Sequence, residues 1–158
     1  MGSGKAQGFV RDTFRKMFAL ELDEDYSMHI PPMPVEVRNY NIGRGPGPNK
    51  DNLHIDMRGK IGSRWNIEVA DILLNEFLKL KANPGWNGLG NPSDAYFLDI
   101  IQKKLERVRT HWRAAQPRFM ESGDVETNSD VERRMIEMKT ERDRTVRMRG
   151  RRISVGAF

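Results

Sequence analysis

A serine and a proline enclose the stretch of sequence that most constrains the fold. Between Ser63 and Pro84, apolar residues recur from Trp65 to Leu80 at the spacing that gathers side chains on one face of an α-helix. Serine is favoured at the start of a helix, and the residue before a proline disfavours helical geometry. The sequence therefore predicts a long amphipathic helix that starts after Ser63 and ends near Asn83.

The stretch QKKLERVRTHWRAAQPRF belongs to a second predicted helix with similar boundaries. Ser93 or Asp94 can cap its start, and Pro117 follows its end at about Gln116. Its apolar residues fall on one stripe, which we expect to face a core. The stripe consists of Phe97, Ile101, Leu105, Val108 and Trp112.

Two further patterns predict helices nearer the ends of the sequence. From Gly8 to Leu22, phenylalanine and methionine recur at helical spacing with basic residues between them, and the acidic patch ELDEDY overlaps the end of this stretch. A third long helix should begin near Ser129 or Asp130. Its inward side chains should be Val131, Met135 and Met138.

Proline and glycine dominate the segment that separates the first two predicted helices. PPMP at Pro31 to Pro34 and GRGPGPNKDN from Gly43 to Asn52 cannot sustain a helix. Apolar and polar residues then alternate from Leu53 to Arg58, which indicates a short extended segment without a clear partner strand. We interpret residues 27–62 as a linker that is mobile or wraps on the surface.

Together these patterns predict an all-α protein, a small helical bundle with a helix-turn-helix-like centre. The length of 158 residues and the hydrophobic content of 37% suit one modest core. The predicted parts are an N-terminal amphipathic helix with an acidic patch (1–26), the linker (27–62), a central helical unit (63–117) and a basic C-terminal helix with its tail (118–158).

Composition excludes several classes of protein. The sequence has no cysteine, which rules out disulfides, cysteine-ligated zinc and thiol nucleophiles. It also lacks a secretory signal and a run of roughly 18 apolar residues, so we expect an intracellular protein without a membrane span. The excess of 27 basic over 22 acidic residues favours polyanionic partners, although weakly.

The second central helix has a cationic side opposite its apolar stripe. We place Lys103, Lys104, Arg107, Thr110 and His111 on that side. Only Asp99 and Glu106 supply negative charge after the cap, so the side lacks the alternating signs of an ordinary salt-bridged helix. Such a face can lie against phosphates or enter a major groove, but it can also be a solvated surface.

The stretch SRWNIEVADILLNEFLKL, a glycine-rich turn with Trp86, and KKLERVRTHWR together resemble the Myb/SANT-like, or trihelix, class of DNA-binding domains over residues 63–117. In this resemblance Trp65 matches the first tryptophan of such a unit. The unit also needs a middle helix, for which the spacing between Leu80 and Tyr96 leaves room for only a short turn of helix around Trp86 to Leu89; without it, a basic helical hairpin remains. The resemblance also implies recognition residues at the exposed positions Lys103, Lys104, Arg107 and Thr110, with Arg113. In overall style the chain is also similar to fungal proteins that share a Trp-Asn helix start and a GPGP-like turn, a resemblance that implies no activity.

Arginine accumulates toward the end of the third long helix. From Arg142 to Arg152 the sequence holds six arginines and one acid, Asp143. Such a cluster is typical of a basic arm that follows phosphates or of a nuclear-import signal, and otherwise of a solvated tail. We favour the arm and expect a nuclear protein. The arm residues that we assign to nucleic-acid binding are Arg144, Arg147, Arg149, Arg151 and Arg152.

Other residue patterns give little support to catalysis, a metal or a cofactor. GSGK at Gly2 to Lys5 lacks the longer glycine spacing and the following Ser or Thr of a phosphate-binding loop. The three histidines, His29, His54 and His111, lack near partners at metal-ligand spacing. Glu68, Asp71 and Glu76 are better explained as the polar face of their helix than as acid/base groups.

We therefore expect a non-enzymatic protein that binds nucleic acid, with duplex DNA favoured, through the basic helix and the arginine arm. The alternative is a protein-interaction or self-assembly module. In that reading Phe9, Phe14, Phe18 and the stripe of Val131, Met135 and Met138 pack against a partner or a second copy.

Overall fold

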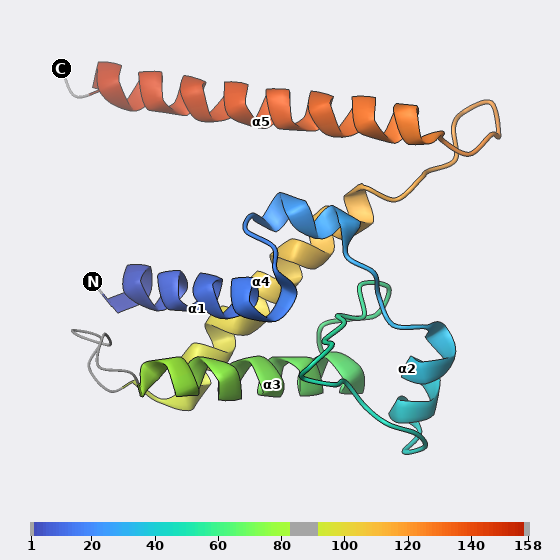
Figure 1. The fold of residues 1–158 in the computed structure, drawn as a ribbon. Helices are drawn as coiled ribbons and strands as arrows, with labels where there is room; N and C mark the ends of the chain where they lie inside the picture. Colours follow the sequence, from blue (N-terminus) through green and yellow to red (C-terminus); the bar gives the residue numbers. More distant parts are fainter. Residues whose placement is uncertain (1, 83–91, 157–158) are drawn as a thin grey trace. The chain divides into compact units, whose positions relative to one another are not determined.

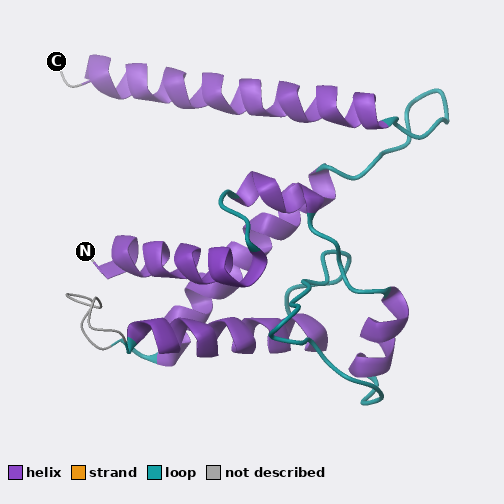
Figure 2. Cartoon of the chain, in the orientation of Figure 1, coloured by secondary structure: helices purple, strands orange, loops and turns teal. Residues whose placement is uncertain are grey.

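A computed structural model of the protein describes residues 2–82 and 92–156 (Figure 1). These residues form five α-helices and one short 3-10 helix, η1, and contain no strand (Figure 2). The predicted all-α class is confirmed. The elements are α1 (Gly2–Phe18), η1 (Asp23–Met28), α2 (Pro34–Asn41), α3 (Arg64–Lys81), α4 (Asp94–Ala114) and α5 (Asn128–Gly156). They belong to two compact units, residues 1–113 and residues 114–158.

In the first unit, α1, α3 and α4 share one hydrophobic core. Helices α1 and α3 lie side by side (Figure 1), and Phe14 of α1 is buried in the same cluster as Phe77 of α3. The Phe77 ring meets the Phe97 ring of α4 with 4.7 Å between centroids. All five residues of the predicted α4 stripe are buried, which confirms that this stripe faces the core.

Local signals set the ends of the two central helices as predicted. The Ser63 hydroxyl accepts a hydrogen bond from the Asn66 amide at 3.3 Å, and the Ser93 hydroxyl accepts one from the Tyr96 amide at 3.4 Å. The N-terminal helix begins at Gly2 rather than Gly8 and ends at Phe18 rather than Leu22. It stops there because Ala19 has a φ of 58°, which is left-handed backbone that ends a right-handed helix. The predicted middle helix around Trp86 lies outside the described residues.

The interpretation of residues 27–62 as a linker is wrong, because this segment helps to build the core. Leu53, Ile55 and Met57 are all buried, and Val37 adds a buried side chain from α2. The extended segment needs no partner strand because the side chain of Asn66 bonds its backbone. The side-chain oxygen of Asn66 accepts a hydrogen bond from the main-chain amide of Asp56 at 3.0 Å. The side-chain nitrogen of Asn66 donates to the carbonyls of Asp56 at 3.0 Å and Lys60 at 2.9 Å.

The second unit consists of an irregular segment followed by α5. Thr127 and Asp130 cap α5 reciprocally: the Thr127 amide donates to the Asp130 carboxylate at 2.9 Å, and the Asp130 amide donates to the Thr127 hydroxyl at 3.2 Å. Arg134 pairs with Glu126 at 2.9 Å and also donates to the carbonyls of Ala114 and Gln116, which fixes the segment to the first turns of α5. The predicted start near Ser129 or Asp130 is within two residues of the observed one.

Candidate nucleic-acid interface

Lys104 does not lie on an exposed basic face, and its predicted position is wrong. Its side chain is 8% exposed and donates to the Asp23 carboxylate of η1 at 2.6 Å, and its ammonium lies 5.1 Å from the centre of the Phe14 ring. The physical reason is helix geometry. At 100° per residue, position 104 is only about 20° from Phe97, so it belongs to the buried side of α4. Lys104 joins two elements of the fold and is not available to a phosphate.

Arg107 and Lys103 are exposed as predicted, but both have acidic partners. Arg107 pairs with the same Asp23 carboxylate at 3.3 Å, and Lys103 pairs with Asp99 one turn earlier at 2.9 Å. Burial alone would raise the pKa of Asp23, but the hydrogen bonds and charges of Lys104 and Arg107 outweigh it and hold that pKa below its ordinary value. Asp23 is therefore anionic at neutral pH and compensates much of the charge on this side of α4.

The other predicted residues of α4 differ in their surroundings. Thr110 is exposed, and its hydroxyl donates to the Glu106 carbonyl at 2.9 Å. His111 is half-buried, whereas Arg113 is exposed. Of the six residues assigned to this helix, Arg113 thus presents its charge most freely to solvent.

The structure gathers basic residues around the C-terminal end of α4 that the sequence patterns did not connect. Arg109 donates to the Gly59 carbonyl, and the Arg58 guanidinium lies 5.7 Å from the centre of the Trp112 ring. Exposed Lys60 adjoins Gly59 in sequence, and Arg113 follows Arg109 by one turn of α4. We call Arg58, Lys60, Arg109 and Arg113 the α4-end cluster. It also complements the negative end of the helix dipole.

The turn that presents the Gly59 carbonyl to Arg109 requires glycine at that position. A Cβ atom at position 59 would collide with the carboxylate of Asp56, which is itself only 7% exposed. A glycine in the segment RGKIG between two basic residues was the one signal in the sequence for this arrangement. Its meaning depended on α4, which is some 50 residues away along the chain.

The arginines of α5 that we assigned to the arm are exposed where the structure describes their side chains, at Arg144, Arg147 and Arg149. The side chains of Arg151 and Arg152 lie outside the described residues, although their backbone belongs to α5. Charge is segregated within this unit. Residues 114–141 hold four basic and seven acidic residues, whereas residues 142–158 hold six basic residues and one acidic residue.

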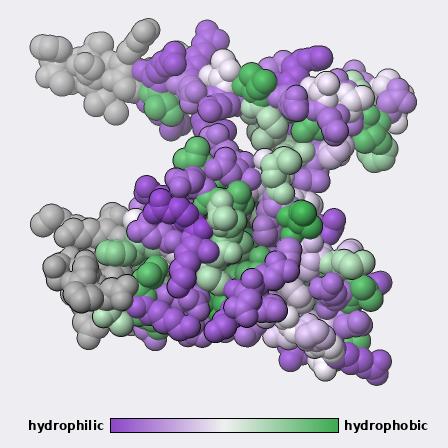
Figure 3. All heavy atoms as spheres, in the orientation of Figure 1, coloured by the Kyte–Doolittle hydropathy of each residue, from purple (hydrophilic) through white to green (hydrophobic). Residues whose placement is uncertain are grey.

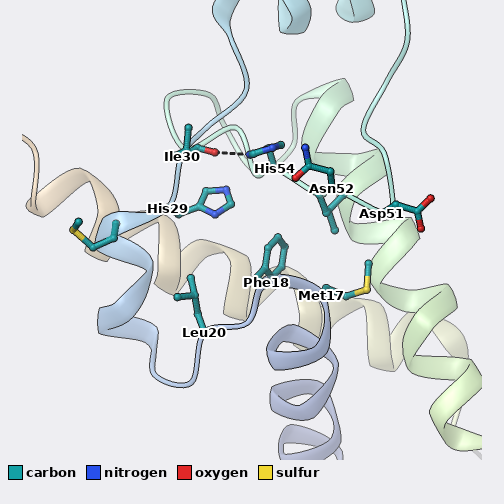
Figure 4. A pocket seen from close by; sticks show the side chains of 10 residues that line it. Met17, Phe18, Leu20, His29, Ile30, Asp51, Asn52 and His54 are labelled. Carbon is teal, nitrogen blue, oxygen red and sulfur yellow. Dashed lines mark hydrogen bonds between the residues drawn. The ribbon is translucent and has the colours of Figure 1, made fainter.

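His29 and His54, which the sequence left far apart, meet in the first unit with 5.9 Å between ring centroids. The Ile55 amide donates to Nε2 of His29 at 2.9 Å, and Nδ1 of His54 lies 2.7 Å from the Ile30 carbonyl oxygen (Figure 4). Burial, and then the proximity of His54, lower the pKa of His29 to about 4. Among the described residues, no group of three His, Asp or Glu side chains could hold a metal ion. The pair is therefore best explained as a structural crossing of two segments.

Glu76 of α3, one of the acids considered for acid/base work, is 7% exposed and makes two ion pairs. It binds Lys79 at 2.9 Å and Lys16 of α1 at 3.2 Å. The hydrogen bond from Lys79, reinforced by Lys16, holds the pKa of Glu76 below its ordinary value despite burial. Glu76 thus ties α1 to α3 as a carboxylate.

Comparison with known proteins found no family model, curated protein or solved structure that matches this chain. Within the described ranges, no helix is both long and apolar enough to cross a membrane.

Proposed function

We propose that this protein binds nucleic acid, with duplex DNA as the first ligand to test, chiefly through phosphate contacts made by the arginine-rich half of α5. The observation that carries the proposal is the charge segregation of the second unit: six arginines and one acid in residues 142–158 follow residues 114–141, in which acids predominate. Arginine donates paired hydrogen bonds that suit phosphate oxygens, and a charge cluster of this kind releases counterions when it binds DNA.

Exposure and helix geometry support the use of α5 as an arm. Arg144 and Arg147 are exposed and lie about 60° apart around the helix, one turn from each other, so they face one side together. The α4-end cluster supplies a second group of cations that can contact phosphates. The Lys103 and Arg107 side of α4 contributes less, because Asp23 and Asp99 compensate its charge.

Binding of this kind is expected to be independent of base sequence. The trihelix-like resemblance assigned base reading to α4, but Lys104 serves the core and Arg107 shares an acid with it. Without Lys104 and Arg107, α4 has few side chains left that could contact DNA bases. The arginines of α5 suit the phosphate backbone of DNA, which is the same in every base sequence.

Fluorescence anisotropy with a labelled random DNA duplex, measured with the full chain over a salt series, tests the proposal. We expect affinity to fall with salt and the Arg144→Glu/Arg147→Glu variant to bind at least about tenfold more weakly. The matched control is Lys103→Glu/Arg107→Glu, which changes the charge equally on α4. If the α4 variant lost more DNA affinity than the α5 variant, the binding site would lie on α4. No binding of DNA even at low salt would refute the proposal.

A second candidate function is self-assembly through α5. The apolar residues on one side of this helix are only partly covered by the described chain: Val131 and Met135 are half-buried, and Met138 and Val146 are 42% and 61% exposed. Figure 3 draws the whole chain, and on the face in view hydrophilic side chains cover most of the coloured surface, with small apolar patches between them. The part of this hypothesis that used Phe14 is wrong, because Phe14 is 1% exposed in the core, and Phe9 and Phe18 pack against the same core. Light scattering over a concentration series tests what remains.

A further inference from the structure

The segment Ile30 to Pro34, with the sequence IPPMP, connects η1 to α2. Residues 30–33 are not helical, and Pro34 is the first residue of α2. The prolines fix φ near −65°, and a residue that precedes proline avoids helical backbone. His29, just before the segment, has φ −62° and ψ 136°, and Met33 within it has φ −64° and ψ 139°. These angles are those of the polyproline II conformation.

The exposure of these residues follows the threefold period of polyproline II. Residues three apart share an edge, so His29 and Pro32 form one edge, which faces inward: Pro32 is buried and the His29 ring packs against Phe18. Ile30 and Met33 form the next edge and are 72% and 62% exposed. The third edge carries half-buried Pro31 and exposed Pro34. The segment thus forms a ridge with one edge in the fold and two edges available.

Three side chains from distant parts of the sequence fix this ridge. The Trp112 indole donates to the His29 carbonyl at 2.9 Å, and Arg58 donates to the Pro32 carbonyl at 3.5 Å. His54 Nδ1 lies 2.7 Å from the Ile30 carbonyl oxygen, so in the neutral ring this nitrogen carries the hydrogen (Figure 4). A partner would therefore meet an ordered ridge and would not have to order a flexible chain.

A hollow lies on each side of Ile30. The first, of about 320 Å³, is lined by Phe18, Met28 and His29 among others and is seen in Figure 4. The second, of about 420 Å³, is lined by Pro31, Pro32 and Trp65. Ile30, Asn52 and His54 line both hollows. Each hollow also includes one acid, Asp51 in the first and Glu36 in the second.

We propose that the Ile30–Pro34 ridge is the docking site of a partner protein domain that has an aromatic-lined groove for polyproline II segments. Such grooves hold the ridges of a preformed polyproline II helix between aromatic side chains. Two exposed edges offer the contact surface, and the flanking hollows can admit aromatic side chains of the partner. Asp51 and Glu36 favour a groove whose rim is basic.

A display library of isolated SH3, WW and EVH1 domains, selected on the immobilised full chain, tests this proposal. The test variant is Ile30→Asp/Met33→Asp, whose two side chains are exposed, so the fold should persist. Pro34→Ala is a second variant that retains the start of α2 while it removes a ring from the ridge. Ile42→Asp is the matched control, because Ile42 is 66% exposed and lies at the other end of α2.

We expect selected domains to bind the parent and Ile42→Asp equally in calorimetric titrations, and to bind the double variant at least about tenfold more weakly. Pro34→Ala should weaken the same domains, and DNA affinity should change little in all the variants, since each of them leaves the arginines of α5 and the α4-end cluster in place. If no domain is retained, or if the parent and the double variant bind equally well, the ridge is not a docking site for this class of partner.

Discussion

At the scale of a single residue, the surroundings of His29 keep its imidazole neutral. Its Nε2 accepts a hydrogen bond from the Ile55 amide, which requires that this nitrogen carry no proton. Its ring packs against Phe18 and lies beside His54. These contacts favour the uncharged form in the folded state, whereas in the unfolded chain the ring titrates normally.

The lowered pKa of His29 predicts a loss of stability on mild acidification. The folded-state value of about 4 lies below the unfolded value of 6.5, so the unfolded chain binds the proton first as pH falls. The stabilising contribution is complete above pH 6.5 and is lost between 6.5 and 4. From pH 7 to pH 5 we expect the free energy of unfolding to decrease by about 2 kcal/mol, measured by urea denaturation.

His29→Gln is the control for this prediction, because glutamine can accept the Ile55 hydrogen bond and does not titrate. The variant should show a much smaller dependence on pH over the same range. If the parent and the variant lose equal stability between pH 7 and pH 5, then another group is responsible and His29 is not held neutral.

At the scale of elements, the Lys104–Asp23 pair joins η1 to α4. The side chain of Lys104 is 8% exposed and that of Asp23 is 27% exposed, so the loss of one partner leaves the other charge largely removed from water. We expect Asp23→Ala to lower the free energy of unfolding by roughly 2–3 kcal/mol. The double variant Asp23→Ala/Lys104→Met should regain most of that loss, because no buried charge remains. Thermal and urea denaturation of the single and double variants complete the cycle.

Lys103 provides the matched control one position away. It pairs with Asp99, but both side chains are more than half exposed, at 68% and 58%. Lys103→Met should therefore change stability by less than about 1 kcal/mol. Equal effects of Lys103→Met and Lys104→Met would show that Lys104 is not a buried cation.

Elements that depend on local signals were predictable from sequence. Ser63 and Ser93 cap their helices as expected, because a cap involves residues three apart, and the α4 stripe is buried because helical periodicity is a local property. The error at Lys104 was avoidable, since the same periodicity places it beside Phe97. What periodicity does not reveal is the partner: Asp23 lies 81 positions from Lys104.

The packed segment 27–62 was not predictable in the same way. Its proline and glycine content indicates only that no long helix runs through it. Its order comes from side chains elsewhere: Asn66 bonds the backbone at Asp56, Trp65 donates to the His54 carbonyl, and Trp112 donates to the His29 carbonyl. The α4-end cluster was missed for the same reason, since Arg109 reaches the Gly59 carbonyl, and Arg58 the Trp112 ring, only when this segment folds against α4.

At the scale of the whole molecule, the two units have different sources of stability. Every residue of the hydrophobic core cluster lies between Ala6 and Trp112, within the first unit. The second unit contributes none of them, and its described contacts include a helix cap, a bridge between Phe119 and Val125, and the bonds of Arg134. The first unit should therefore fold without α5, and functions that depend on α5 should be separable from that fold.

A chain that ends at Gln116 tests this separation. We expect it to unfold cooperatively at a midpoint close to that of the full chain, because it retains the whole core cluster, and to lose most of its salt-dependent DNA binding together with the arginines of α5. If α5 also mediates self-assembly, light scattering should show association only in the full chain. Full-length Met138→Gln/Val146→Gln should then be monomeric while it retains DNA binding, since these substitutions alter the apolar side of α5 without changing its charge and leave Arg144 and Arg147 in place. A shortened chain that is unfolded, or that binds DNA as tightly as the full chain, would show that the division of roles between the two units is wrong.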